Sequence, residues 1–331
     1  MIINLLILLI KILLVFVGLL SGFAVMTWFE RRLIAGFQVR SGPNRVGPFG
    51  LLQPAADGLK LAMKEDIAIA NRDRFVFTMA PMISMMAALV SFCIIPFGPD
   101  GLKIGGYAIP LHIAADAPVG FLFVLAVASI GIYGIVLAGW SSGSKYSLLG
   151  GMRSSAQMIS YELAMGMALV SVLVYTGSLR PMDIMMHEGM WWKQFPALVI
   201  FFVCMIAETN RAPFDLVEAE QELVAGFHTE YSSFKFALFY MGEYVNMITF
   251  SALAVTLWFG GWRGPMAEHY PLLGVIYFIA KIAVFMFVYV WIRATLVRIR
   301  YDRLMALGWT LLLPSALIWA ALTAVWVVLR P

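Results

Sequence analysis

Apolar residues run along this chain in eight stretches of about 20 residues, separated by polar segments. An apolar helix of that length spans the ~30 Å hydrocarbon core of a bilayer. The pattern therefore predicts an all-α, polytopic membrane protein with about eight transmembrane helices, at 2–24, 75–96, 118–140, 156–176, 192–208, 237–260, 271–293 and 308–328.

The first apolar stretch is expected to be a retained helix rather than a cleaved signal. It runs past 20 residues, has no basic leader and is followed by Glu30, Arg31 and Arg32. Lys11 lies near its middle, where we expect the amine to snorkel toward the surface or to face protein.

The polar segment after this stretch predicts a shaped turn and then an interfacial amphipathic helix. Residues 42–50, GPNRVGPFG, hold three glycines and two prolines, which exclude a helix. From 52 onward the residues separate onto two helical faces, an apolar one with Leu52, Ala55, Ala56, Leu59 and Ala62 and a polar one with Gln53, Asp57, Lys60 and Lys64. Such a helix lies along the membrane surface, either as a plain anchor or as the frame of a lateral opening for a lipid-like substrate.

Composition agrees with a membrane protein, and charge predicts its orientation. The chain is 62% hydrophobic and 13% charged, with a mean hydropathy of +0.87. Of its 23 lysines and arginines, sixteen fall in connections on one side and five on the other. We therefore expect the N-terminus outside and the long loops cytoplasmic, so that topology, not nucleic acid, explains the net charge of +4. A single membrane domain, 1–331, would carry inner loops at about 28–74, 141–155, 209–236 and 294–307.

The sequence contains no pattern for a redox, metal or nucleotide site. Its two cysteines, Cys93 and Cys204, lie in different predicted spans, so neither iron–sulfur nor zinc spacing is present. The four histidines fall in loops, and GxGxxG and P-loop motifs do not occur. If the protein takes part in redox chemistry, a partner must hold the cofactor.

Acidic residues gather in one inner connection, AETNRAPFDLVEAEQELVAGFHTEYS at 207–232, which holds six of the nineteen acids. Glu218 and Glu222 stand four apart on any helix and repel each other, and Glu220 adds a third charge. A solvated helix face is the ordinary interpretation of such a run. The interleaved apolar residues favour partial burial, which suits groups that take up and release protons.

Besides Lys11, the ionisable residues of the predicted spans include Glu162, Glu208, Glu243 and Lys281. A buried carboxyl must be protonated or paired, so each could simply be a satisfied packing group. Together they suggest a polar track for protons.

A basic segment from Arg293 to Arg303 follows the seventh span, where it could bind lipid headgroups, line a substrate channel or dock an acidic partner.

Several motifs together resemble one known family. They are ERR at 30–32, GPNRVGPFGLLQP at 42–54, KYSLLG at 145–150, RSSAQMISYE at 153–162, the acidic segment, GEYVNM at 242–247, and WIRAT with RYDRLMALGW within 291–309. In this order they resemble a family of membrane subunits of NADH:quinone oxidoreductase, respiratory complex I, which includes bacterial members and mitochondrial subunit 1.

The resemblance implies a subunit that forms much of a quinone-access tunnel and couples quinone reduction to proton translocation. The tunnel residues it implies are Glu30, Arg31, Asp57, Lys60, Phe227 and Arg293. The proton path would hold Glu162, Glu208, Glu218, Glu220, Glu222 and Glu243, with Lys281 from the polar track. The chain itself would bind no redox cofactor. Quinone would be the substrate, and partner subunits of the complex would hold FMN, NADH and iron–sulfur clusters, in a bacterial inner membrane.

Some positions depart from the family pattern. Val297, Arg303 and Thr310 stand where many relatives have Pro, Gln and Lys, and Ser129 stands where some have a glutamate.

Two alternative functions stay open at this point. One is the related membrane subunit of a proton-pumping hydrogenase or formate hydrogenlyase. The other is a stand-alone secondary transporter, although the two halves of the chain show no repeat.

Overall fold

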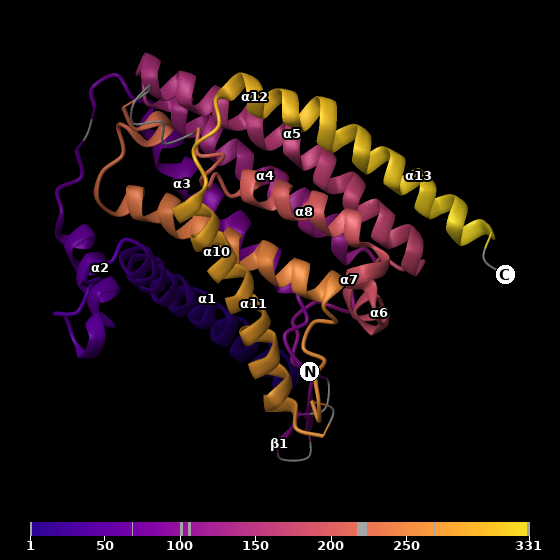
Figure 1. Ribbon diagram of the computed structural model, residues 1–331. Helices are drawn as coiled ribbons and strands as arrows, with labels where there is room; N and C mark the ends of the chain where they lie inside the picture. Colours follow the sequence, from indigo (N-terminus) through magenta and orange to yellow (C-terminus); the bar gives the residue numbers. More distant parts are fainter. Residues whose placement is uncertain are drawn as a thin grey trace.

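The computed structural model describes residues 2–67, 69–99, 102–104, 107–216, 224–267 and 269–329 (Figure 1). In these ranges the regular structure is helical apart from one antiparallel hairpin, β1 (Leu102–Ile104) and β2 (Tyr107–Ile109), in which Leu102 pairs with Ile109. The prediction of an all-α polytopic membrane protein is confirmed.

Long helices make up most of the molecule. They are α1 (Ile2–Phe37), α3 (Arg74–Ser91), α4 (Gly120–Ser141), α5 (Lys145–Thr176), α10 (Ser233–Trp258), α11 (Pro271–Thr295), and the continuous run of α12 (Tyr301–Ala306), the π-helical η4 (Leu307–Leu312) and α13 (Leu313–Leu329). The shorter elements are η1 (Pro48–Gly50), α2 (Gln53–Met63), η2 (Phe92–Ile94), α6 (Pro181–Met186), α7 (Met190–Lys193), α8 (Phe195–Glu208) and η3 (Gly226–His228).

Seven helices among the described residues are long and apolar enough to cross a membrane. The eighth predicted span corresponds to α8, which is apolar but has only 14 residues. At 1.5 Å per residue it covers roughly 21 Å, less than the thickness of the hydrocarbon core.

Two helices extend well beyond the apolar stretches that predict them. α1 continues to Phe37, so Glu30 and Arg31 lie on a helix, and α5 begins at Lys145 rather than at 156. Hydropathy marks only the part of a helix that lies in hydrocarbon, whereas backbone hydrogen bonding continues until a helix-breaking residue. α5 ends where Gly177 adopts a φ of 68° and donates its N–H to the carbonyl of Leu173 at 2.8 Å.

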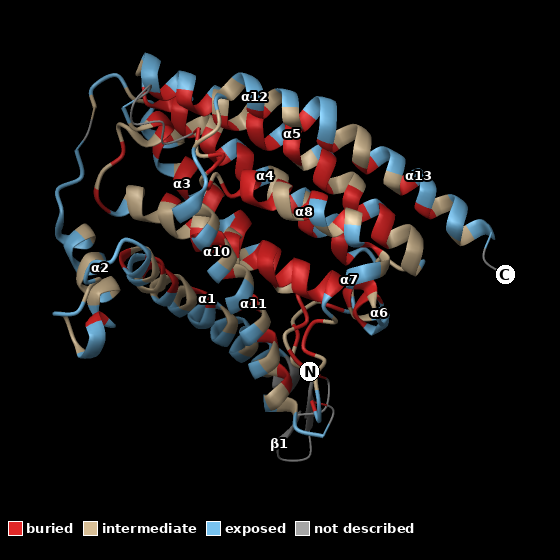
Figure 2. Cartoon of the chain, in the orientation of Figure 1, coloured by how far each residue is buried: buried red, intermediate tan, exposed pale blue. Residues whose placement is uncertain are grey.

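The buried core lies in α3, α4, α5, α8 and α10, with α1 and α11 on one side and α13 packed along α5 on the other (Figures 1 and 2). Only 6% of the spanning part of α1 is buried, against 67% of α10. Most of α1 therefore faces outward, where lipid or another protein would cover it.

The turn predicted at 42–50 and the helix predicted after it are both present. Trp28 and Arg32 of α1 donate to the carbonyl of Phe49, at 3.0 and 3.1 Å. Gly50 has a φ of 77°, and a Cβ there would lie 2.2 Å from the carbonyl oxygen of Pro43, so only glycine fits. This compact turn joins α1 to α2, which contacts both α1 and α10.

Candidate functional site

A buried carboxylate, Glu30 of α1, gathers side chains from three other segments. Glu30 is 4% exposed. Tyr244 of α10 donates its hydroxyl to Glu30 Oε2 at 2.6 Å, Arg211 Nη1 lies 3.4 Å from Oε1, and Arg293 of α11 also donates to Oε1. A buried charge costs several kcal/mol unless it is paired, so the two guanidiniums explain how an ionised carboxylate is held here.

Arg211 joins Glu30 to a second carboxylate. Its Nε lies 2.7 Å from Oε1 of Glu243 on α10, and its guanidinium carbon lies 4.2 Å from the ring centre of Tyr244. Burial acts to lower the pKa of Arg211, but Glu243, Tyr244 and Glu30 outweigh it and hold that pKa well above the usual value. Arg211 therefore keeps its positive charge between two acids.

The turn that carries this arginine follows directly from the end of α8. Asn210 has a φ of 50°, a conformation that asparagine adopts more readily than most residues. The side-chain amide of Gln157 on α5 donates to the carbonyls of Ala207 and Phe214, at 2.8 and 2.9 Å. α5 thus holds both sides of the turn.

Two further carboxyls lie deeper in the bundle. Glu208, the last residue of α8, is 3% exposed, and its Oε2 is buried without a hydrogen-bond partner among the described residues. Glu162 of α5 forms a hydrogen bond with the hydroxyl of Ser129 on α4. Ser129 Oγ also lies 3.0 Å from the carbonyl of Leu125. A hydroxyl has one hydrogen, so a Ser129 that donates to Leu125 can still accept a hydrogen bond from protonated Glu162.

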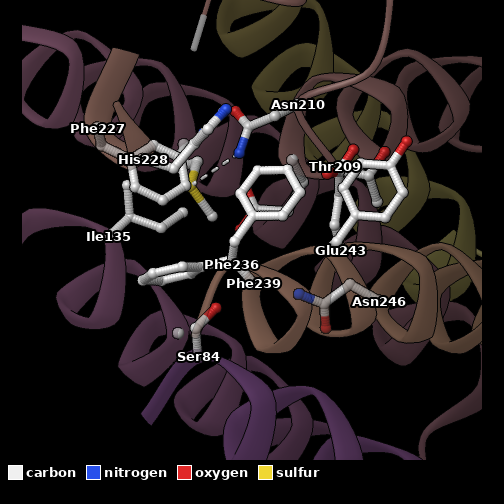
Figure 3. Close-up of a pocket in the computed structure, with 14 residues that line it drawn as sticks. Ser84, Ile135, Thr209, Asn210, Phe227, His228, Phe236, Phe239, Glu243 and Asn246 are labelled. Atoms are coloured by element: carbon white, nitrogen blue, oxygen red, sulfur yellow. Dashed lines mark hydrogen bonds between the residues drawn. The ribbon is translucent and has the colours of Figure 1, made fainter. Parts of the chain in front are cut away.

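A small cavity connects Glu208 of α8 with Glu243 of α10 (Figure 3). The space open to the centre of a water molecule is about 50 Å³. One buried water needs roughly 10–15 Å³ on this measure, so a short chain of waters fits. Its polar lining also includes Ser84, Asn246 and His228, and Figure 3 shows Phe227 and Phe239 among the aromatic residues around it.

The structure divides the predicted tunnel residues into three places. Glu30 and Arg293 meet in the buried network. Arg31 of α1 pairs with Asp57 of α2 at 2.5 Å, and Lys60 lies exposed on α2. Phe227 is buried in the wall of the cavity, with its ring against Phe239 and His228.

The predicted proton-path residues also separate. Glu208 and Glu243 share the cavity, with Glu162 on neighbouring α5. Lys281 lies elsewhere, and its amine donates at 2.8 Å to each of the carbonyls of Phe259, Gly261 and Arg263. Glu218, Glu220 and Glu222 lie outside the described residues.

The residues that join these groups, Arg211 and Tyr244, have no distinctive pattern in the sequence. Arg211 counts in the sequence only as one more basic residue on the inner side, and Tyr244 as a neighbour of Glu243. The one available signal is that Arg211 stands alone as a cation in the most acidic part of the chain. Lys11, for which the sequence suggests no partner, has its Nζ 3.5 Å from the carbonyl of His112.

His228 on the cavity wall makes the stability of this region depend on pH. Burial lowers the pKa of His228 from 6.5 to about 4, although Asp215 acts to raise it. The folded state therefore binds fewer protons than the unfolded state below pH 6.5, so stability is full above pH 6.5 and falls as the pH drops toward 4. By linkage the loss at pH 5 is about 2 kcal/mol.

We expect His228→Gln, which cannot take up this proton, to reduce that sensitivity. The measurement is the midpoint temperature of thermal inactivation of the protein, taken at pH 7 and at pH 5. From pH 7 to pH 5 the midpoint temperature should fall further in the wild type than in the variant. Equal losses would show that protonation of His228 does not contribute to the sensitivity to acid.

Comparison with known proteins gives consistent matches over nearly the whole chain. The model of the NADH dehydrogenase family matches residues 10–324. The chain is 53% identical to NADH-quinone oxidoreductase subunit 8 of Thermus thermophilus, covering 96% of this chain and 86% of that protein. It is 52% identical to NADH-quinone oxidoreductase subunits of Geobacter metallireducens (95% and 94%) and Geobacter sulfurreducens (97% and 94%).

Proposed function

The chain belongs to the NADH dehydrogenase family, and from this premise we propose that it forms much of a quinone-access tunnel and couples quinone reduction to proton translocation. It is a multi-pass membrane subunit of an oxidoreductase complex. The hydrogenase and transporter alternatives gain no support, because the relatives named above are NADH-quinone oxidoreductase subunits.

The observation that carries the proposal is the position of Arg211 between Glu30 and Glu243. With Arg293, this network holds two acids and two guanidiniums, so its charges balance. A charge gained or lost beside Glu30 changes how strongly Arg211 attracts Glu243. Two unit charges 4 Å apart interact by about 4 kcal/mol at an effective dielectric of 20. A negative charge gained beside Glu30 would compete with Glu243 for the guanidinium of Arg211, which is how the network would pass a change of charge from one acid to the other.

The quinone would enter from the membrane where α1, α2 and α10 meet. The outward face of α1 is apolar and mostly exposed, and the Arg31–Asp57 pair ties α2 to it. Lys60 on the exposed face of α2 would lie at the border of this opening. Its inner end would be the Glu30–Arg293 pair, which offers charged hydrogen-bond partners to a quinone headgroup. Phe227 would stand between the tunnel and the cavity.

The proton path would run from Glu162 with Ser129, through Glu208 and the waters of the cavity, to Glu243. Glu208 has an unpartnered carboxyl oxygen on the cavity wall, which suits a group that exchanges protons with water. Glu218, Glu220 and Glu222 would extend the path on the cytoplasmic side. Lys281 would be a fixed charge, because three carbonyls hold its amine. These carbonyls belong to the turn after α10, which would lie on the outer side.

We propose that the chain lies in a bacterial inner membrane, with its N-terminus outside and its long loops cytoplasmic. Its partners would be the other subunits of complex I, quinone and lipids. The peripheral subunits would hold NADH, FMN and the iron–sulfur clusters that deliver electrons to the quinone, and this chain would bind no redox cofactor of its own.

Glu208→Gln tests the proposed path, because glutamine keeps the size of the side chain but carries no exchangeable acid proton. We expect NADH:quinone turnover and coupled proton pumping by the assembled complex to fall about tenfold or more. This is less than the roughly hundredfold minimum for a general acid or base in a reaction step, because waters in the cavity would still carry part of the proton flow. NADH oxidation by a water-soluble artificial acceptor should stay unchanged, because the peripheral subunits perform it.

Glu65→Gln is the matched control, since it removes an exposed carboxylate of the inner loop. It should leave both rates at the wild-type level. Wild-type pumping in Glu208→Gln would remove Glu208 from the path.

A further inference from the structure

A second, larger cavity lies at the opposite end of α10 from α2. It forms where α10 ends at Trp258, before α11 begins at Pro271, and α6 and α7 lie beside it (Figure 1). Its volume is about 410 Å³, within the range of small-molecule sites. The lining residues that matter here are Glu188, Trp191, Trp258, Phe259, Trp262 and Arg263.

The cavity carries side chains of both charges. Arg263 Nη2 lies 3.3 Å from Glu188 Oε1, and Arg263 Nη1 donates to the carbonyl of Met186 at 3.0 Å. The side chain of Glu188 is 83% exposed and that of Arg263 is 31% exposed. Both charges are therefore accessible, and an exposed pair of this kind is weak enough for a ligand to share.

The wall that carries Arg263 is fixed in place. Lys281 of α11 donates to the carbonyls of Phe259, Gly261 and Arg263, each at 2.8 Å, which uses all three hydrogens of its ammonium group. Because these carbonyls belong to the turn after α10, the turn is attached to α11. The packing of α11 against the turn after α10 therefore keeps this wall of the cavity in place.

Aromatic side chains supply the rest of the lining. Trp191 and Phe259 are 53% and 39% exposed at the point where spanning helices end, the depth at which tryptophan is enriched in membrane proteins. Their ring faces can also bind a cation. Trp262 is 4% exposed, and among the described residues its indole N–H has no acceptor, so an oxygen atom of a ligand would satisfy it.

We propose that this cavity binds the headgroup of a zwitterionic phospholipid of the phosphatidylethanolamine type. The phosphate lies at Arg263, and the ammonium lies at Glu188 and the aromatic rings. An anionic headgroup would meet the carboxylate of Glu188 without a compensating cation. A ligand without charge would leave both side chains unused. Lys281 only fixes the wall of the site, and the site uses none of the glutamates of the proposed proton path.

A photoactivatable phosphatidylethanolamine with a diazirine near its headgroup tests the proposal. The assembled complex is placed in nanodiscs of phosphatidylglycerol with a small fraction of the probe, irradiated and mapped by peptide mass spectrometry. We expect adducts within residues 185–193 and 258–264. Unlabelled phosphatidylethanolamine should compete with the probe, and added phosphatidylglycerol should not.

Two variants and two matched controls assign the contacts. Arg263→Gln and Glu188→Gln should each lower labelling about tenfold, the effect of losing a hydrogen bond to a charged group. Arg180→Gln and Asp183→Asn remove exposed charges of α6 and the residue before it, outside the cavity, and should label like the wild type. NADH:quinone turnover at the wild-type level in all four shows that each is assembled.

Several outcomes would overturn the proposal. One is the absence of adducts in both segments of the wild-type protein. Another is labelling that falls equally in the controls. Labelling by a phosphatidylglycerol probe that survives Glu188→Gln would identify an anionic lipid site instead, and full competition by a quinone analogue would identify a quinone site.

Discussion

Arg211→Met should reduce NADH:quinone turnover of the complex by more than a hundredfold. The substitution keeps an unbranched side chain but leaves Glu30 with one guanidinium and removes the 2.7 Å ion pair of Glu243. Breaking a buried ion pair by removing one partner costs about 3–5 kcal/mol, because the remaining charge stays buried without compensation. Both the amount of assembled complex in the membrane and its turnover per assembled complex should be measured.

Companion variants separate stability from coupling in this prediction. Arg211→Lys keeps the charge but not the flat, forked group that reaches two carboxylates, so it should recover assembly better than turnover. Arg211→Met combined with Glu243→Gln removes the orphaned acid and should also recover assembly, while turnover stays low. Arg40→Met, at an exposed arginine after α1, is the control. Full turnover in Arg211→Met would exclude Arg211 as the link between the two acids.

Gly150→Ala should destabilise the cavity wall, whereas Gly166→Ala in the same helix should have little effect. A Cβ at Gly150 would lie 2.7 Å from the backbone of Gly226 and Phe227 in η3. At Gly166 nothing lies within 4 Å of the new Cβ. Inserting a methyl group against backbone that cannot move costs about 1–3 kcal/mol.

The measurement is the midpoint of thermal inactivation of the assembled complex, together with quinone turnover, since η3 carries Phe227 and His228. Gly150→Ala should lower both. Gly166→Ala introduces the same methyl group into the same helix and controls for a general effect of helix rigidity. Equal midpoints for the two variants would show that the contact between α5 and η3 does not limit stability.

The membrane architecture could be predicted because it depends on local chemistry. An apolar run of about 20 residues has few alternatives to a spanning helix, so seven of the eight stretches locate helices long enough to cross a membrane. The eighth locates the shorter α8, including its end at Glu208. The prediction is less accurate for helix ends, as α1 and α5 show, because hydrogen bonding does not stop at the membrane boundary. The turn at 42–50 could also be predicted, since its glycines and prolines restrict the backbone directly.

The partners of the charged residues could not be predicted in this way. Depth within a span groups Lys281 with the glutamates, but depth does not say which neighbour a side chain faces, and Lys281 faces three carbonyls of the turn after α10. Ser129 has no charge and would not be grouped with Glu162 by its residue type, yet the two are in contact.

The sequence by itself determined that this is a helical membrane protein of a particular family, with acids concentrated near one loop. Only the tertiary structure decided that α1, α10, α11 and the turn after α8 meet, so that Arg211 lies between Glu30 and Glu243. The physical reason is the range of the interactions. Hydropathy and backbone restriction act over a few neighbouring residues, whereas an ion pair between residues 181 positions apart depends on how whole helices pack.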